Sequence, residues 1–330
     1  MSEGPDKGGP ATSLTDAIQR AWQARNSLHG GADREDARQN AYRVFHGFHD
    51  GFRGLNIDRL GESCLVSLKH DLTEHLPVIE RAVRACHDFK RVVARTHLRH
   101  NYDPQPLAVL ALVVEVPEAP FPVKDNGMEF LIDLSAEANP GLFLDARPVR
   151  RWIKENSRDR RVLNLFSYTG SLGVAAAVGG AKSVTHVDHN AKALAVARSN
   201  HELNGCPITD RELLKGDIYY HLPRAARSGI SFDAIILDPP PRLSRSKRRR
   251  PRGQDYPKLT KLVTPLLAEG GWLLCFFHRY ECTREAYERE VLDASDCELD
   301  ITWRGTSGDD FPERDPDQKL RLTVFERRRQ

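Results

Sequence analysis

The sequence predicts an α/β protein whose main domain is a doubly wound, mainly parallel sheet, preceded by a small α+β domain. The segment from Arg161 to Gly205 reads as strand, glycine turn, helix, strand and helix. This order is that of a βαβ unit, whose two strands lie parallel in one sheet. Short apolar runs follow around Leu213 and over residues 233–238 and 272–277, as expected for further strands of the same sheet.

Composition limits the kind of protein that this chain can be. Its 330 residues are enough for two domains, and its apolar and charged fractions, 40% and 29%, are typical of a globular protein. No apolar run reaches the length of a membrane span, and residues 1–13, rich in Gly and Pro, lack the apolar core of a signal peptide. The six cysteines form no C-x-x-C pair. We therefore expect a cytoplasmic protein with a disordered tail over residues 1–13 and no metal site.

Residues 14–135 are expected to hold a helical segment and a small α+β domain, with the main domain over residues 136–330. Apolar spacing predicts a helix over residues 14–28, and a second helix is expected over residues 33–44. Gly51 and Gly61 mark turns between short strands. The remaining predicted elements are a helix over residues 76–86 and strands over residues 92–96, 108–116 and 128–132.

The turn after the first strand of the main domain marks the predicted ligand site. Residues 167–171 have turn chemistry, and Gly170 can adopt a positive φ. Asp188 ends the second strand, so its carboxylate lies at the edge where open α/β sheets bind ligands. A carboxylate there can accept hydrogen bonds from both hydroxyls of a ribose, which predicts an adenosine-type cofactor. The alternative is that Asp188 only caps the next helix, for which Asn190 is a suitable N-cap.

The composition of the turn bears on which cofactor it binds. A dinucleotide-binding turn has the pattern G-x-G-x-x-G, whereas only Gly170 and Gly173 are present here, and Tyr168 and Thr169 stand where the tight glycines would be. S-adenosylmethionine carries no phosphate and does not need that clearance. The turn therefore favours S-adenosylmethionine over NAD, with a nicotinamide or nucleotide enzyme on the same sheet as the alternative.

Two further acidic residues follow later strands. Asp217 comes after the strand around Leu213 and can accept a hydrogen bond from an adenine amino group. Asp238 ends the strand over residues 233–238 and is followed by two prolines, Pro239 and Pro240. This tripeptide resembles the [DN]-P-P-[YF] motif of methyltransferases that act on planar nitrogens and bases, although a third proline stands where the aromatic residue would be.

Three longer segments carry a resemblance to one family. The segments GLFLDARPVRRWI, VLNLFSYTGSLGVAAAVGGAKSVTHVD and LDPPPRLSRSK look like those of the bacterial 23S ribosomal RNA methyltransferases that modify cytosine C5 or guanine N7. The resemblance covers roughly Tyr42 to the C-terminus. It implies a Rossmann-like class I methyltransferase with a seven-stranded sheet, S-adenosylmethionine as cofactor and ribosomal RNA as partner. It also implies that the domain before the catalytic one helps to hold RNA.

The resemblance adds residues to the expected cofactor pocket. It implies that Phe143, Asp145 and Arg147 lie there, and Arg147 could then pair with the methionine carboxylate while Asp145 orients it. An ordinary Asp–Arg pair at a helix start is the alternative. The full set of candidate cofactor-binding residues is Phe143, Asp145, Arg147, Asn164, Phe166, Tyr168, Thr169, Gly170, Asp188, Asp217 and Asp238.

A strongly basic stretch follows the D-P-P tripeptide. Seven cations lie within eleven residues from Arg242 to Arg252. Such a run attracts a polyanion and makes its binding salt-dependent, whereas the alternative is a solvated loop without a partner. The candidate RNA-binding residues are Arg242, Arg245, Lys247, Arg248, Arg249 and Arg250.

The residue after the fifth strand bears on the atom that is methylated. Methylation of cytosine C5 needs a cysteine thiolate that attacks C6, and in cytosine-C5 members of the family that cysteine follows the fifth strand. Here His278 occupies the position of that cysteine. Cys275 lies three residues earlier, inside the predicted strand, and Cys282 is a weak alternative as the nucleophile. Guanine N7 has a lone pair and needs no covalent step, so a nitrogen acceptor is favoured. The candidate catalytic residues are Asp238, Pro239, Pro240 and His278, with base stacking expected from Tyr256, Phe277 or Tyr280.

Two other functions stay open from the sequence. A non-catalytic RNA-binding or ribosome-assembly protein on a methyltransferase fold could also lack the cysteine and the D-P-P aromatic residue. A methyltransferase with a protein or small-molecule acceptor would carry the same cofactor site.

Overall fold

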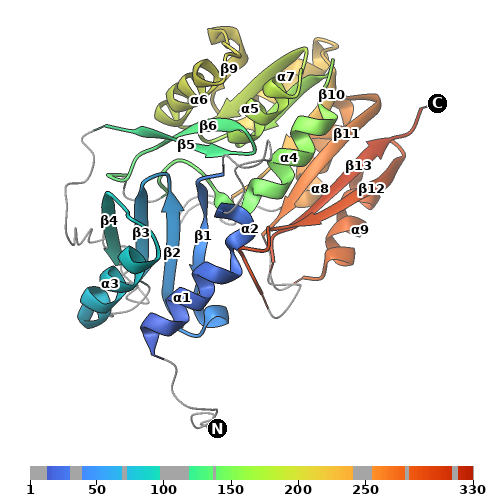
Figure 1. Cartoon of the computed structure of the whole chain (residues 1–330). Coiled ribbons are helices and arrows are strands. Elements are labelled where there is room, and N and C mark those ends of the chain that lie inside the picture. Colours follow the sequence, from blue (N-terminus) through green and yellow to red (C-terminus); the bar gives the residue numbers. More distant parts are fainter. Residues whose placement is uncertain are drawn as a thin grey trace, which may run out of the picture. The chain divides into compact units, whose positions relative to one another are not determined.

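The chain forms two compact units, Met1–Glu118 and Ala119–Gln330 (Figure 1). The computed structural model describes residues 13–29, 39–68, 73–96, 119–136, 139–240, 255–278, 282–313 and 319–329.

The boundary between the units lies one β-hairpin earlier than the predicted boundary between residues 135 and 136. This hairpin consists of strands β5 (Phe121–Asp125) and β6 (Met128–Ile132). It belongs to the second unit because Leu131 N–H donates to Asn200 Oδ1 of helix α6 (Ala191–Leu203) over 2.8 Å. The sequence predicted β6 but gave no signal for this long-range attachment.

The first unit is a four-stranded sheet that shares one apolar core with two helices. Ile18 of helix α1 (Leu14–Ala24) and Ile79 of helix α3 (Leu76–Cys86) are fully buried in the same cluster as Ile57 of the sheet. The strands lie in the order β1 (Ala41–His46), β2 (Leu55–Leu60), β3 (Ser63–Leu68) and β4 (Arg91–Thr96), and shorter elements are α2 (Asn26–His29), η2 (Gly47–Asp50) and η3 (Thr73–His75).

The prediction of a helix over residues 33–44 is wrong for residues 39–44, which are not helical. Residues 41–44 belong to β1, where Tyr42 pairs with Arg59 of antiparallel strand β2. Tyr42 and Phe45 are fully buried, so tertiary pairing and core packing decide the conformation of this segment. Residues 33–38, the strand expected over 108–116 and the tail over 1–12 lie outside the described residues.

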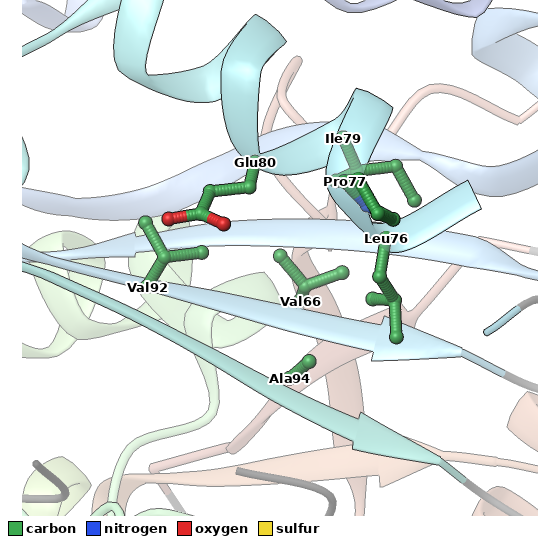
Figure 2. Close-up of a pocket in the computed structure, with 7 residues that line it drawn as sticks. All are labelled: Val66, Leu76, Pro77, Ile79, Glu80, Val92 and Ala94. Carbon is green, nitrogen blue, oxygen red and sulfur yellow. The ribbon is translucent and has the colours of Figure 1, made fainter. Parts of the chain in front are cut away.

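A small cavity of about 110 Å³ lies between α3 and the strands β3 and β4 (Figure 2). Its walls are apolar except for Glu80, whose carboxylate pairs with Arg84 over 2.9 Å. None of the predicted cofactor-binding residues lines it; the lining residues are Val66, Leu76, Pro77, Ile79, Glu80, Val92 and Ala94.

The second unit is built on a seven-stranded sheet, which confirms the predicted architecture (Figure 1). The five strands from β11 to β9 are parallel, whereas β13 runs antiparallel to both β11 and β12. The order is β12 (Leu299–Thr306), β13 (Arg321–Arg327), β11 (Leu267–Phe277), β10 (Phe232–Leu237), β7 (Arg161–Leu165), β8 (Ser183–Asp188) and β9 (Leu213–Lys215).

Helices cover both faces of this sheet. On one face, side chains of α7 (Ile218–Arg227), α8 (Tyr256–Val263) and α9 (Arg284–Ala294) share an apolar core with alternate residues of the central strands. On the other face, α5 (Ser171–Val178) packs against β7, β8, α4 (Arg147–Asn156) and α6. Short 3₁₀ turns are η4 (Leu144–Ala146), η5 (Asp210–Glu212) and η6 (Thr264–Leu266).

Among the described helices, none combines the length and the apolar composition that crossing a membrane requires.

Candidate functional site

The turn between β7 and α5 has an unusual backbone. Phe166 and Tyr168 have φ values of 57° and 47°, and Gly170 has a φ of 78°. For a residue with a side chain, the left-handed conformation costs roughly 1–2 kcal/mol. Such conformations persist only where neighbouring contacts impose them, and they concentrate at functional sites. The strained turn therefore supports the predicted ligand site.

Asp188 fixes this turn from the neighbouring strand. Its side chain is 9% exposed, and Oδ2 accepts a hydrogen bond of 2.8 Å from Tyr168 N–H. Oδ1 accepts a hydrogen bond of 2.8 Å from Asn190 N–H. The N-cap of α6 is Asn190, whose own side chain accepts from Lys192 N–H and Ala193 N–H. Capping is thus done by Asn190, and the carboxylate of Asp188 is held at the carboxyl edge of the sheet.

A loop before α4 closes over the same turn. Thr169 Oγ1 donates to the carbonyl oxygen of Gly141 over 2.6 Å, and Tyr168 Oη donates to that of Asn139 over 3.0 Å. The rings of Phe143 and Tyr168 meet edge to face, with centroids 5.7 Å apart. Phe143 is 48% exposed, so it presents an aromatic surface to solvent next to the turn. The structure thus brings these predicted residues together.

Arg147 has a partner that the sequence did not predict. Both of its Nη atoms donate to the two carboxylate oxygens of Asp310, which is completely buried. The two residues are 163 positions apart in the chain. The guanidinium of Arg147 is therefore held by a bidentate pair within the protein, next to the loop that carries Phe143 and Asp145.

Asn164, a predicted cofactor-binding residue, has its side chain engaged within the protein. It is buried in β7 opposite His186 of β8, and its Nδ2 donates to His186 Nδ1 over 3.2 Å. His186 Nε2 lies 2.9 Å from His201 Nε2, and His201 Nδ1 lies 2.9 Å from the carbonyl oxygen of Cys206. Because a carbonyl oxygen only accepts, His201 Nδ1 donates to Cys206, and His186 Nε2 therefore donates to His201 Nε2. Each hydrogen bond of the series thus points from Asn164 toward Cys206.

Burial determines the charge of the two histidines in this chain. Loss of solvation, with a smaller contribution from the neighbouring His201, lowers the pKa of His186 to about 3. Burial likewise lowers the pKa of His201. Both rings are therefore neutral at physiological pH, and each donates one hydrogen bond and accepts one.

Asp238 and His278 meet at the ends of two neighbouring parallel strands, β10 and β11. His278 Nε2 lies 2.8 Å from Asp238 Oδ1. Burial lowers the pKa of His278, but the hydrogen bond and the charge of Asp238 outweigh it, and Asp145 adds to their effect. The pKa of His278 is consequently raised above its ordinary value. Pro239 is buried and Pro240 is half-buried beside this pair.

Asp217 lies at the start of α7, after β9. Its Oδ1 accepts a hydrogen bond of 2.9 Å from Tyr219 N–H, so it is the N-cap of that helix. The side chain is exposed, and β9 lies next to β8, the strand that Asp188 ends. Asp217 therefore follows the strand that is adjacent to the one ended by Asp188.

The predicted base-stacking residues are placed differently. Tyr256 and Phe277 are fully buried, and both pack against Tyr287 in the core beneath α8 and α9. Neither ring is available to a base in this conformation. Tyr280 and the candidate RNA-binding residues lie outside the described residues; these are Arg242, Arg245, Lys247, Arg248, Arg249 and Arg250.

Cys275, in the strand that precedes His278, is not activated as a nucleophile. Cys275 is completely buried among apolar side chains, and burial raises the pKa of its thiol well above the ordinary value. Cys282 is half-buried at the border of the same apolar cluster. Among the residues that the structure describes, no group of three or more His, Cys, Asp or Glu side chains could hold a metal ion.

Comparison with known proteins gives the family of the chain. A family model described as S-adenosylmethionine-dependent methyltransferase matches residues 43–326. The ribosomal RNA large subunit methyltransferase I of Klebsiella pneumoniae is 31% identical over 281 residues, which are 84% of this chain and 67% of the relative. The protein of the same name from Escherichia coli is 29% identical over 261 residues, which are 78% of this chain and 65% of the relative. The chain thus spans about two thirds of the length of these relatives.

Solved structures show the same fold. A candidate SAM-dependent methyltransferase from Streptococcus mutans superposes with a TM-score of 0.81 and 23% identity over 96% of this chain and 83% of that chain. A candidate methyltransferase complexed with SAH gives a TM-score of 0.82 at the same identity and coverage. Because the family model covers most of the sequence, the chain belongs to the S-adenosylmethionine-dependent methyltransferase family, and S-adenosylmethionine is its cofactor.

Proposed function

We propose that this methyltransferase modifies a base of large-subunit ribosomal RNA, with guanine N7 favoured over cytosine C5 as the acceptor atom. The observation that carries the choice of atom is His278, paired with Asp238 where a cytosine-C5 enzyme would present its cysteine. The names of the relatives support ribosomal RNA as the substrate class.

The cofactor is proposed to bind along the carboxyl edge of β7, β8 and β9. This edge suits the cofactor because it presents the buried carboxylate of Asp188. Two backbone N–H groups already orient that carboxylate. Asp188 would hold the ribose hydroxyls and Asp217 the adenine amino group. The exposed ring of Phe143 would cover the ligand. The other proposed cofactor-binding residues are Asp145, Phe166, Tyr168, Thr169, Gly170 and Asp238.

The acceptor atom decides which groups the enzyme must supply. The cofactor supplies a methyl group on a sulfonium, which an acceptor lone pair can take by in-line displacement. Guanine N7 has such a lone pair, so orientation and exclusion of water suffice. Cytosine C5 would need a thiolate, and Cys275 is buried with a raised pKa. These conditions favour the nitrogen acceptor.

Asp238 and His278 are proposed to orient the base. Methylation of N7 transfers the positive charge of the sulfonium to the purine ring. The carboxylate of Asp238 would stabilise this charge, and the carbonyl oxygens of Pro239 and Pro240 would accept hydrogen bonds from the base. His278 would hold the carboxylate in place through their 2.8 Å contact.

The basic stretch from Arg242 to Arg252 is proposed to contact RNA phosphates. Its support is the charge density of the sequence, seven cations directly after the D-P-P tripeptide. Contacts with phosphates strengthen binding without reading the base sequence.

Methyl transfer from labelled S-adenosylmethionine tests the substrate class. The purified protein would be incubated with total RNA from a strain that lacks the gene, and label would be measured in separated 23S, 16S and transfer RNA. Label in 23S RNA alone is expected. Label in another RNA, or in a protein fraction, would contradict the proposed substrate.

A further inference from the structure

Asn200 of α6 joins two segments that lie far from it in the sequence. Its side chain is completely buried. Its Oδ1 accepts a hydrogen bond of 2.8 Å from Leu131 N–H in β6, and its Nδ2 donates one of 2.9 Å to the carbonyl oxygen of Thr169. A backbone N–H only donates and a carbonyl only accepts, so both atoms of the amide are committed. The asparagine thus ties the β-hairpin to the turn after β7.

The bond to Thr169 reaches the strained part of that turn. Tyr168, with its φ of 47°, precedes Thr169 directly. Tyr168 N–H is held by Asp188, and the carbonyl oxygen of Thr169 is held by Asn200. The segment Tyr168–Thr169 is therefore fixed by hydrogen bonds at its first N–H and at its last carbonyl group. Removal of either hydrogen bond lets the backbone relax toward conformations of lower energy.

We infer that Asn200 is a positioning residue for the cofactor turn: it holds Tyr168 and Thr169 in the conformation that the cofactor requires. The inference rests on the proposed cofactor site at this turn. Without the hydrogen bond from Asn200 to Thr169, only a fraction of the molecules would have the turn in its binding conformation. The apparent Kd rises in inverse proportion to that fraction, with no contact to the ligand removed.

Asn204, one helical turn further along, provides a matched control. Its Oδ1 accepts from Glu129 N–H over 2.9 Å, and its Nδ2 donates to the carbonyl oxygens of Glu129 and Asn200, each over 2.7 Å. It therefore ties the same helix to the same hairpin through a comparable set of hydrogen bonds. Within the described residues, none of these bonds reaches the turn.

The experiment compares Asn200→Ala with Asn204→Ala. The affinity for S-adenosylhomocysteine would be measured by titration calorimetry, and the midpoint of thermal unfolding by circular dichroism. Asn200→Ala is expected to raise the Kd about tenfold, the scale of one buried hydrogen bond. The two variants should lower the unfolding midpoint by similar amounts, because each loses a comparable set of hydrogen bonds. Asn204→Ala should nevertheless leave the Kd within about twofold of wild type. An unchanged Kd in Asn200→Ala, or an equal rise in both variants, would overturn the inference.

Asp188→Ala separates this inference from the proposed cofactor site. If this variant binds S-adenosylhomocysteine like wild type, the proposed site itself is wrong. If Asp188→Ala binds weakly while Asn200→Ala does not, the site stands and the positioning role falls.

If the alanine variant of Asn200 does not fold, the milder pair Asn200→Ser and Asn204→Ser replaces the two alanine variants. Amide hydrogen exchange of Thr169 and Gly170 in the free protein gives a second measurement. Faster exchange in Asn200→Ser than in Asn204→Ser is expected, and equal rates would refute the role.

Discussion

His278 and Asp238, 40 positions apart in the chain, lie 2.8 Å apart because each directly follows one of two paired parallel strands. Both side chains are about one quarter exposed, so the pair is accessible from the carboxyl edge of the sheet. An acidic group that follows β10 is thereby oriented by a basic group that follows β11. The proposed orientation of the base depends on this pair.

Replacement of His278 should therefore impair the chemical step more than cofactor binding. We expect His278→Ala to lower kcat by roughly 10–100-fold, because Asp238 loses the charge-assisted hydrogen bond that orients it. His278→Gln should be intermediate, since its amide can still donate to Asp238 but carries no charge. Single-turnover methyl transfer and calorimetry with S-adenosylhomocysteine separate the two effects. A loss of cofactor affinity as large as the loss of kcat would argue against the assigned role.

The pH dependence of the reaction gives a second view of the same pair. The pKa of His278 is raised, so its protonated form persists above the ordinary value of about 6.5. If that form orients Asp238, the rate falls as the pH rises through the pKa of the folded protein. A pH–rate profile should show this falling limb in wild type and lack it in His278→Gln; the same limb in both would assign it to another group.

Arg147 and Asp310 should stabilise the fold as a unit. Removal of one partner leaves a buried charge without compensation, which costs about 3–5 kcal/mol. We expect Arg147→Ala and Asp310→Ala to lower the free energy of unfolding by similar amounts, and the double variant to cost less than the sum. Urea denaturation of the four proteins measures this coupling. Strict additivity would show that the pair does not act as a unit.

His186 should make the protein sensitive to acid. Its pKa is about 3 in the folded state and about 6.5 in the unfolded state, so below pH 6.5 the unfolded chain binds a proton that the folded chain does not. Stability therefore falls by about 1.4 kcal/mol per pH unit from this residue as the pH drops. His186→Gln should show a shallower loss between pH 6 and pH 4 in chemical denaturation. Parallel curves for the two proteins would mean that His186 is protonated in the folded state.

The basic stretch should determine the salt dependence of RNA binding. Each lost phosphate contact lowers the slope of log K against log salt by roughly 0.7–0.9. Replacement of Arg248, Arg249 and Arg250 by Gln should then reduce the slope by about 2–3 and weaken the binding of RNA molecules of different sequence to the same extent. Filter binding at several salt concentrations measures this slope. An unchanged slope would remove these three residues from the RNA interface.

Local patterns in the sequence were sufficient to predict the sheet, and they also suggested the edge at which the cofactor is proposed to bind. The alternation of strands and helices from Arg161 onward predicted the parallel core. The acidic residues at the end of β8 and after β9 and β10 marked the proposed ligand edge. These features depend on short segments, in which period and turn chemistry are informative.

Contacts between distant segments were not predictable in this way. Asp310 is the partner of Arg147 only because β12 and α4 lie together in the fold. The contact of Asn164 with His186 of the neighbouring strand arises from the side-chain alternation of β7 and the pairing of β7 with β8. The helix expected before Phe45 became a strand through pairing with β2. In each case the deciding partner is remote in sequence.

The identity of the methylated nucleoside tests the central proposal most directly. Ribosomal RNA from a strain that lacks the gene would be methylated by the purified enzyme, digested to nucleosides and analysed by mass spectrometry. The lone-pair chemistry inferred from His278 and the buried Cys275 predicts 7-methylguanosine. The appearance of 5-methylcytidine would contradict it and require a cysteine nucleophile.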